Sequence, residues 1–335
     1  MAEKKILLEV KGLKTCFPLK TETVHAVNGV SFVIYEGDTF GLVGESGCGK
    51  SQTLYSILRL LKKPGVIQGG SIIYKGRDLV SLPEKEMQQV RGKEIAQIFQ
   101  EPMTALNPVL TIRKQLFESF EHTPMTKKQK EAHAVELLRM VGIPSPEKRL
   151  NEYPHQFSGG MRQRAMIAIA LGEKPRLLLA DEPTTALDVT IQDQILTLIN
   201  DLKEKLGMSM ILVTHDLGVV AQMCNRVAVM YAGLIMESTD AITLFSKPRH
   251  PYTKALMSSI PNGSGKKLDT ISGTPPNLAA DIIGCPFAPR CRYAVDTCRQ
   301  VLPDLCEIEP GHMTRCHRLD VVAGFDGLIP VEEKT

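Results

Sequence analysis

The sequence of 335 residues predicts an α/β protein. Short apolar runs of strand length alternate with amphipathic stretches from about residue 39 to 232. The runs are almost continuous in apolar residues, which is typical of parallel strands buried on both faces of a sheet. A glycine-rich segment, 44–51, follows the first of these runs and precedes a helical pattern. Both ends of the chain depart from this alternation, so we expect additional parts there.

Five runs are expected as strands of the parallel sheet: residues 39–43, 95–99, 177–180, 210–213 and 227–230. Four stretches are expected as helices: residues 52–61, 127–141, 159–171 and 190–205. Thr126 is a suitable N-cap for the second helix, and Gly142 is a suitable stop after it.

The remaining segments predict the domain organisation. Residues 7–15 and 24–35 resemble strands of an N-terminal antiparallel sheet, which residues 71–74 would join. Residues 101–175 are mostly helical and interrupt the strand series, as an inserted helical subdomain would. A turn-rich linker, 261–267, leads into a tail rich in Pro and Cys with little periodicity. We therefore expect a main domain at 1–262 and a C-terminal tail at 263–335.

Composition excludes several classes of protein. An apolar content of 43% and a charged content of 23% are those of an ordinary globular protein, and a net charge of +3 is too small to favour nucleic acid as a partner. No run of about 18 apolar residues occurs, and the N-terminus lacks the apolar core of a signal peptide. We expect a cytosolic protein that reaches a membrane only by docking on another protein.

The segment from Gly44 to Ser51 reads Gly-Glu-Ser-Gly-Cys-Gly-Lys-Ser and matches the phosphate-binding pattern G-x-x-x-x-G-K-[ST]. Its glycines allow backbone N–H groups to point at phosphate oxygens, and the following helix adds its positive end. Lys50 is expected to reach the β- and γ-phosphates, and Ser51 to ligate Mg²⁺. The pattern predicts a bound nucleoside triphosphate, and by itself it fits a kinase or a GTPase as well.

Polar residues follow three of the expected strands, and the loop 44–51 follows a fourth. Asp181 and Glu182 end the run 177–180, Gln100 follows 95–99, and His215 follows 210–213. Ligands in parallel sheets bind beyond the carboxyl ends of strands, so these side chains and the loop 44–51 should converge on one site. There Asp181 would hold Mg²⁺, Glu182 would act as the general base on water, and His215 would approach the γ-phosphate.

A second anion-binding surface is expected at the start of the helix 159–171. Ser158 would cap this helix, and Gly159 and Gly160 would leave its N-terminal amides open to an anion.

Six segments in this order resemble the ATPases of ABC transporters over about residues 6–260: the loop 44–51, Gln100, the signature 158–163, Asp181 with Glu182, the segment 186–188, and His215. The resemblance implies an ABC-type P-loop NTPase with a RecA-like core, an N-terminal antiparallel β-subdomain and an inserted helical subdomain. It implies ATP and Mg²⁺ as ligands and ATP hydrolysis as the activity. Mg²⁺ would be held by Ser51, Gln100 and Asp181, and Glu182, His215 and Gln100 would be catalytic.

The resemblance also implies how ATP is bound. Phe17 would stack on adenine. The other contacts within the chain would come from Gly44, Glu45, Ser46, Gly47, Cys48, Gly49, Lys50, Ser51, Gln52, Gln100, Asp181, Glu182 and His215. Two such domains form a head-to-tail dimer, so Ser158, Gly159 and Gly160 would contact the ATP of the partner. Phe157 and Met161 depart from the usual Leu and Gln of the signature, and Met161 cannot donate a hydrogen bond.

Finer segments resemble the dipeptide and oligopeptide permease ATPases: 101–108, 157–164 and 250–253. This branch implies an importer of di- or oligopeptides, with nickel uptake as the alternative cargo because nickel ATPases are close relatives. The implied partners are a second, non-identical ATPase, two transmembrane permease subunits and a periplasmic or extracellular solute-binding protein. The implied location is the cytoplasmic side of the inner membrane, as a peripheral protein.

Four cysteines of the tail are spaced C-x5-C-x6-C-x17-C: Cys285, Cys291, Cys298 and Cys316. Four thiolates suit a [4Fe–4S] cluster or structural Zn²⁺, and the absence of C-x2-C pairs favours iron–sulfur. The permease resemblance implies the [4Fe–4S] cluster too, with Cys306 outside the ligand set.

Two competing functions make different demands on the sequence. A soluble ABC ATPase acting on DNA or ribosomes would show a tandem module, a long coiled coil or a basic surface, and none is visible. A non-hydrolytic regulatory subunit would lack Glu182 or His215, and both are present.

Overall fold

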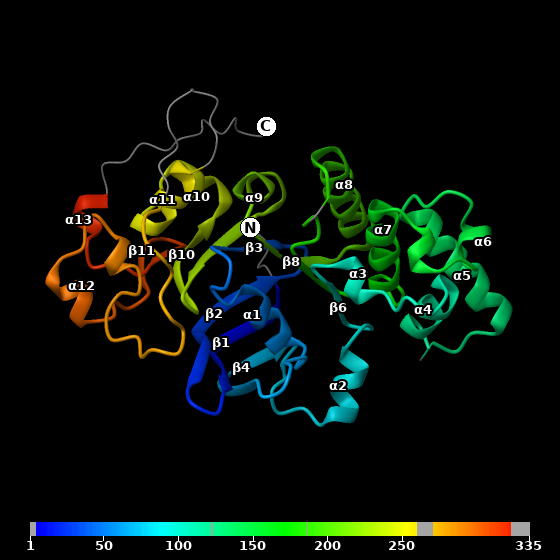
Figure 1. The fold of residues 1–335 in the computed structure, drawn as a ribbon, viewed down its shortest axis with the longest axis horizontal. Helices are drawn as coiled ribbons and strands as arrows, with labels where there is room; N and C mark the ends of the chain where they lie inside the picture. The colour runs from blue at the N-terminus through cyan, green and yellow to red at the C-terminus, as the bar shows by residue number, and fades with distance from the viewer. Residues whose placement is uncertain (1–4, 122, 186, 260–270, 323–335) are drawn as a thin grey trace. The chain divides into compact units, whose positions relative to one another are not determined.

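The computed structural model describes residues 5–121, 123–185, 187–259 and 271–322. The expected linker 261–267 and Ala186 of the segment 186–188 lie outside these residues. The chain divides into two compact units (Figure 1). One consists of Met1–Ser81 with Val213–Thr335, and the other of Leu82–Leu212.

An antiparallel sheet forms the N-terminal part of the first unit. It contains β1 (Ile6–Pro18), β2 (Thr23–Tyr35), β4 (Val66–Tyr74) and β5 (Arg77–Asp78), in the order β2-β1-β4-β5. Both neighbours of β1 pair with it in antiparallel register. The helix α1 (Lys50–Ile57) contacts β1 and β2. The expected N-terminal antiparallel sheet is therefore confirmed.

A second set of strands in the first unit follows the order β11-β12-β10-β9-β3. The expected strands at 39–43 and 227–230 are β3 (Thr39–Val43) and β9 (Arg226–Tyr231), and they pair in parallel. The strands β10 (Leu234–Asp240), β12 (His312–Thr314) and β11 (Cys306–Glu309) continue this set in antiparallel pairing.

The strands β11 and β12 lie in the tail, whose sequence shows little periodicity. They are short, and neither contains the apolar run by which the other strands were predicted. Their place in the fold depends on a buried pair instead. His312 Nε2 on β12 lies 2.7 Å from Glu237 Oε1 on β10, and both side chains are almost completely buried.

The helices of the first unit other than α1 all lie in its C-terminal segment (Figure 1). They are α9 (Leu217–Met223), α10 (Ala241–Ser246), α11 (Pro251–Ser258), η2 (Ala288–Arg290), α12 (Asp296–Gln300) and α13 (Leu319–Val322). Phe287, beside η2, packs with its ring centroid 5.2 Å from that of Tyr252 on α11. This contact places the tail against α11.

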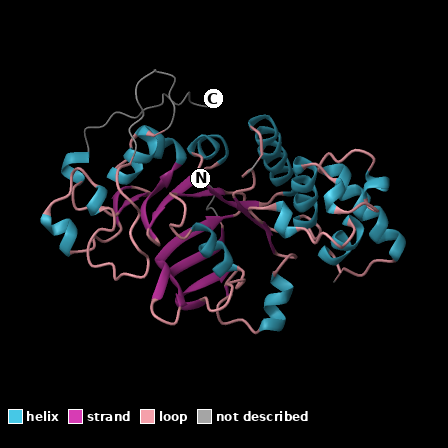
Figure 2. Cartoon of the chain, viewed as in Figure 1, coloured by secondary structure: helices cyan, strands magenta, loops and turns pink. Residues whose placement is uncertain are grey.

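The second unit is mostly helical, as the cyan ribbons of Figure 2 show. Its strands β6 (Ile95–Ile98) and β7 (Leu177–Asp181) pair in parallel. Between them lie α3 (Pro102–Ala105), α4 (Ile112–Ser119), α5 (Lys127–Met140), α6 (Pro146–Arg149), η1 (Pro154–Gln156) and α7 (Gly159–Ala170). The helix α2 (Glu84–Val90) precedes β6, and α8 (Val189–Leu206) follows β7. The strand β8 (Ser209–Thr214) runs across the boundary between the units.

The predicted ends of the second expected helix are confirmed in detail. Thr126 and Gln129 form a capping box at the start of α5, in which each side chain accepts the backbone N–H of the other residue. At the other end Gly142 has a φ of +73°, the left-handed conformation that stops a helix.

A search of the described residues for membrane-spanning helices finds none of sufficient length and apolar character.

Candidate nucleotide-binding site

The phosphate loop 44–49 connects β3 to α1, as the pattern predicted. Its backbone requires glycine at two points. Gly44 has a φ of +150°, and a Cβ there would lie 2.1 Å from the carbonyl oxygen of Met230. Gly49 has a φ of +106°, and a Cβ there would lie 2.2 Å from the carbonyl oxygen of Ala26. The loop is thus pressed against β9 and β2, in a shape that only glycine allows at these positions.

The loop curls around the ammonium group of Lys50. Lys50 Nζ donates hydrogen bonds to the carbonyl oxygens of Gly44, at 2.7 Å, and Glu45, at 3.0 Å. The side chain is buried. Ser51 and Gln52 follow in the first turn of α1, where the backbone N–H groups of a helix have no intrahelical partner. Glycines that leave no room for a side chain, with a buried ammonium in the bend, fit a site for phosphate groups.

Cys48 has a buried side chain in the loop. Its Sγ lies 3.8 Å from Lys50 Nζ, and burial raises the pKa of the thiol despite this nearby charge. The loop therefore carries a neutral thiol at neutral pH, which adds no negative charge where phosphates would bind.

Glu45 has partners in the C-terminal segment that the sequence did not indicate. Its carboxylate forms two hydrogen bonds with Arg290, and its backbone N–H donates to Tyr252 Oη at 2.9 Å. Tyr252 belongs to the segment 250–253, which was singled out only as a resemblance to the permease branch. Arg290 lies between Cys285 and Cys291, in a segment whose pattern predicted only metal ligands. A pairing across 245 residues leaves no periodic signal in a single sequence.

In the second unit the structure brings two predicted catalytic residues together. Gln100 follows β6 and Glu182 follows β7, and these strands are parallel neighbours. Gln100 Nε2 donates a hydrogen bond of 2.9 Å to Glu182 Oε2, and Thr185 Oγ1 donates another of 2.9 Å to the same oxygen. Asp181, the last residue of β7, is fully buried.

Glu182 also has an unusual backbone conformation. Its φ is +45°, in the left-handed region that residues other than glycine rarely adopt. Such a conformation costs on the order of 1–3 kcal/mol and is found mainly at functional sites. Together with its two hydrogen-bond donors, this makes Glu182 a constrained carboxylate at the end of a buried strand.

The second anion-binding surface has the expected local structure. Ser158 is the N-cap of α7, and its Oγ accepts the backbone N–H of Met161 at 3.3 Å. Phe157, the departure from the usual Leu, is buried. Ser158 and Gly159 are exposed, so the first amides of α7 face solvent.

Two more predicted residues lie in the first unit. Phe17 is the half-buried penultimate residue of β1, and a Cβ at Gly65 would meet its ring at 2.6 Å. His215 is exposed between β8 and α9, where Asp216 caps the helix by accepting the N–H of Gly218 at 2.8 Å. Gln100, Asp181, Glu182 and Ser158 belong to the second unit. The convergence of both groups on one nucleotide stays a prediction.

The prediction of a [4Fe–4S] cluster, or of Zn²⁺, in the tail is wrong. Cys285, Cys291, Cys298 and Cys316 do line one cavity, but its volume is only about 20 Å³. No group of three or more His, Cys, Asp or Glu residues in the described ranges is placed to hold a metal ion. None of the eight cysteines, all of which lie in the described ranges, forms a disulfide.

Burial explains the state of these thiols. It raises the pKa of Cys285 and of Cys316 to about 11, and it raises the pKa of Cys291 as well. The thiols of these three residues are therefore neutral near pH 7. Together with Cys298 they pack around a small cavity beside Phe287.

Two family descriptions match the chain. The ABC transporter family matches residues 27–185, and the C-terminal region of oligopeptide/dipeptide transporters matches residues 236–298. The second match includes Tyr252 and Arg290.

Similar proteins extend over almost the whole chain. A probable peptide ABC transporter ATP-binding protein, y4tR of Sinorhizobium fredii, is 51% identical over 96% of this chain and 97% of its own. The oligopeptide transport ATP-binding protein OppD of Bacillus subtilis is 50% identical over 92% of this chain and 88% of its own. The dipeptide transport ATP-binding protein DppD of the same organism is 50% identical over 92% and 94%. Their names describe ATP-binding transport proteins and mention no iron–sulfur centre.

Among solved structures, the dimeric bacterial ABC transporter cassette MJ0796 superposes with a TM-score of 0.63 at 28% identity. It covers 70% of this chain, and the match covers 99% of that cassette. A dimeric post-hydrolysis state of the same cassette, bound to ADP and Pi, matches equally well.

Proposed function

The chain belongs to the oligopeptide/dipeptide branch of the ABC transporter ATP-binding proteins, and from this premise we propose that it hydrolyses ATP to drive the import of di- and oligopeptides. The observation that supports the hydrolytic role most directly is the hydrogen bond of 2.9 Å from Gln100 to Glu182. It orients the carboxylate that a water molecule would need as its base.

The phosphate loop binds the triphosphate in this proposal. Gly44 and Gly49 leave the backbone amides unobstructed by side chains, and Lys50 turns from the loop carbonyls to the β- and γ-phosphates. In this proposal Mg²⁺ would be held by the oxygen donors of Ser51, Gln100 and Asp181, and it would neutralise charge on the phosphates. Phe17 stacks on the adenine ring.

Glu182 accepts the proton of the attacking water as that water bonds to the γ-phosphorus. On the opposite side, the bond between the γ-phosphorus and the oxygen that bridges the β- and γ-phosphates breaks. That oxygen keeps the bonding electrons and leaves as part of ADP. Gln100 and Thr185 hold the carboxylate in place through their hydrogen bonds to Oε2. His215 contacts the γ-phosphate.

The exposed start of α7 supports a role in a second site. We assign Ser158, Gly159 and Gly160 to the ATP of a partner ATPase in a head-to-tail dimer, where the open amides of α7 would receive the γ-phosphate. In this proposal the partner is a second, non-identical ATPase subunit.

The same proposal covers the organisation and location of the chain. The helices between β6 and β7 act as a helical subdomain inserted in a main domain of 1–262, and residues 263–335 form a tail. The membrane-embedded partners are two permease subunits, supplied with peptide by a solute-binding protein. The chain docks on them from the cytoplasmic side of the inner membrane.

The test is a transporter reconstituted in vesicles from this chain and its co-purified membrane partners. We expect a solute-binding protein loaded with di- or oligopeptide to stimulate ATP turnover and to deliver peptide into the vesicle lumen. Stimulation by nickel alone, with no response to peptide, would replace peptide by nickel as the cargo.

A further inference from the structure

Glu45, the second residue of the phosphate loop, is held by the C-terminal tail. Arg290 Nη1 lies 2.6 Å from Glu45 Oε2, and Arg290 Nη2 lies 2.9 Å from Glu45 Oε1. The Arg290 side chain is 5% exposed and that of Glu45 is 23% exposed. Two parallel hydrogen bonds between a guanidinium and a carboxylate define distance and orientation together. At this degree of burial the pair is more than a surface ion pair.

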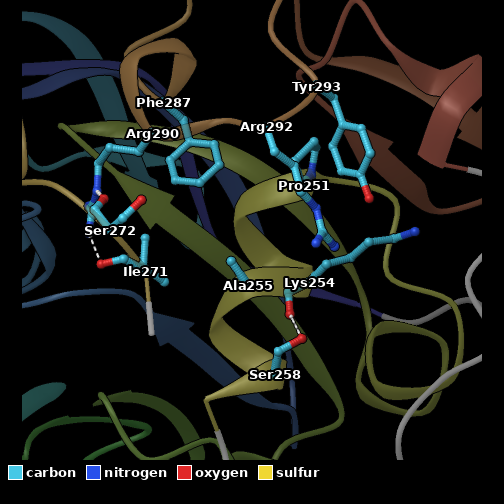
Figure 3. A pocket seen from close by; sticks show the side chains of 10 residues that line it. All are labelled: Pro251, Lys254, Ala255, Ser258, Ile271, Ser272, Phe287, Arg290, Arg292 and Tyr293. Carbon is cyan, nitrogen blue, oxygen red and sulfur yellow. Dashed lines mark hydrogen bonds between the residues drawn. The ribbon is translucent and has the colours of Figure 1, made fainter. Parts of the chain in front are cut away.

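Arg290 is itself immobilised by its remaining donors. Its Nε donates to the carbonyl oxygen of Ser272 at 2.9 Å, and Nη1 also donates to Tyr231 Oη at 3.1 Å. Figure 3 shows Arg290 turned towards Ser272 and Ile271, away from Lys254 and Arg292 across the pocket of about 230 Å³ that these residues line. The guanidinium of Arg290 is therefore held in one orientation by the tail and by Tyr231.

The backbone of Glu45 is tied to the same part of the chain. Its N–H donates to Tyr252 Oη at 2.9 Å, and the ring of Tyr252 lies 4.6 Å from that of Tyr231 and 5.2 Å from that of Phe287. On the other side of the residue, the carbonyl oxygen of Glu45 accepts Lys50 Nζ at 3.0 Å. A continuous series of contacts thus joins the tail, through Glu45, to the lysine that would hold the phosphates.

The charge of Glu45 makes the pairing important for binding. A carboxylate in the phosphate loop repels the negative phosphates of ATP, because like charges a few ångströms apart disfavour each other strongly where water is scarce. Arg290 compensates this charge and prevents the carboxylate from turning towards the phosphates. Without Arg290 the loop would be less ordered and would carry an uncompensated negative charge.

We infer that Arg290 is a positioning residue for ATP binding, through which the tail orients the phosphate loop and neutralises Glu45. The inference deepens the proposed function, since it assigns the tail a role in the ATP site of the same chain. It gives a role to the two hydrogen bonds that join Arg290 to Glu45 across 245 positions of the sequence.

The experiment measures the Kd of the purified full-length chain for ATP, by titration calorimetry, in single and double variants. We expect Arg290→Met to raise the Kd about tenfold, and Arg290→Lys to raise it about threefold because the charge remains without the paired geometry. Glu45→Gln should raise the Kd less than Arg290→Met does, because the charge that it leaves unpaired is the positive guanidinium of Arg290, which does not repel phosphates. The double variant Glu45→Gln with Arg290→Met should return to within about threefold of wild type.

Arg292→Met is the matched control. Arg292 lines the same pocket but is exposed, with its guanidinium over the Tyr293 ring. It should leave the Kd unchanged. The inference is overturned if Arg290→Met binds ATP like wild type, or if the double variant binds as weakly as Arg290→Met. The double variant also lacks the Arg290 contacts with Ser272 and Tyr231, so recovery in it excludes a general loss of folding as the cause.

Failure of the proposed function has a different signature. In that case the wild-type chain would bind ATP, and the variants would rank as expected, while peptide would not stimulate hydrolysis in the reconstituted transporter.

Discussion

Gln100 Nε2 donates a hydrogen bond of 2.9 Å to Glu182 Oε2 across 82 positions of the sequence. The bond is possible because β6 and β7 are parallel neighbours, so the residues that follow them meet at one edge. Thr185 donates to the same oxygen from the turn after Glu182. Two donors from different segments thus hold one oxygen of the carboxylate. A base that accepts a proton from a positioned water needs such an orientation.

Replacing Glu182 by Gln should abolish most hydrolysis without weakening ATP binding. The amide has the shape of the carboxylate but cannot accept a proton, and general-base catalysis contributes about 10²–10⁴-fold to rates. We expect ATP turnover of the assembled transporter to fall at least 100-fold, on the order of the lower end of this range, with the Kd for ATP within about threefold of wild type.

Glu204→Gln is the control for this change. Glu204 is exposed on α8 in the same unit, so the substitution removes the same charge away from the candidate site. It should leave turnover unaffected. If Glu182→Gln hydrolysed ATP at the wild-type rate, another group would have to be the base.

Replacing a glycine of the phosphate loop by alanine should weaken ATP binding at Gly49 and be tolerated at Gly47. A Cβ at Gly49 would lie 2.2 Å from the carbonyl oxygen of Ala26, whereas a Cβ at Gly47 would have no atom within 4 Å. Both residues have positive φ, so Gly47→Ala should still cost about 1 kcal/mol of stability. Gly49→Ala should displace the loop, raise the Kd for ATP at least tenfold (about 1.4 kcal/mol), and lower the melting temperature further.

Equal Kd values for these two alanine variants would show that the contact with Ala26 does not define the loop. Titration calorimetry and differential scanning calorimetry on the same samples separate binding from stability.

The elements that sequence reasoning could predict are those with a strong local pattern. The runs that became β3, β6, β7, β8 and β9 are buried on both faces, so each reads as an almost continuous apolar segment. The loop 44–51 and the cap at Ser158 follow from residue types whose backbone preferences are specific. The pairing of Gln100 with Glu182 was foreseeable because parallel strands end at one edge.

The contacts that sequence reasoning missed join distant segments through single residues. Nothing local marks Arg290 as the partner of Glu45, or His312 as the partner of Glu237. The cysteine spacing led to the wrong prediction of a metal site. Four thiols that packing brings together can have the same spacing in the sequence as four metal ligands. Spacing indicates which residues can meet, whereas the arrangement of their side chains determines whether they can hold a metal ion.

The first unit should lose stability in mild acid because of His250. Its Nδ1 accepts the N–H of Tyr252 at 3.0 Å, and burial lowers its pKa to about 4, with Glu237 and Arg315 nearby as opposing charges. The unfolded chain binds this proton near pH 6.5. The folded state is therefore fully favoured above pH 6.5, and the free energy of unfolding decreases as the pH falls towards 4. We expect a loss of about 2 kcal/mol between pH 7 and pH 5.

His250→Asn should reduce this pH dependence. Asn can still accept the N–H of Tyr252 as the N-cap of α11, but it does not titrate. Urea unfolding curves at the two pH values measure the difference. An equal loss in the variant and in wild type would assign the acid sensitivity to other groups.

The final prediction separates the structural role of Ser158 from its role at the partner's ATP. Ser158 caps α7 and Thr126 caps α5, each through a side-chain oxygen that accepts a backbone N–H three residues on. Replacing either residue by Ala should cost about 1 kcal/mol of stability. The two variants, Ser158→Ala and Thr126→Ala, are therefore a matched pair within one unit, with similar effects on unfolding by denaturant.

Only Ser158→Ala should affect catalysis. It removes a hydroxyl from the exposed anion-binding surface, so the turnover of the assembled transporter should fall about tenfold, as for loss of one hydrogen bond to a charged group. ATP binding to the chain's own phosphate loop should be unchanged, because in the proposed dimer Ser158 serves the other site. Equal turnover in the two variants would leave Ser158 as a helix cap alone. Weakened ATP binding by the isolated Ser158→Ala chain would place the residue at its own nucleotide and contradict the head-to-tail arrangement.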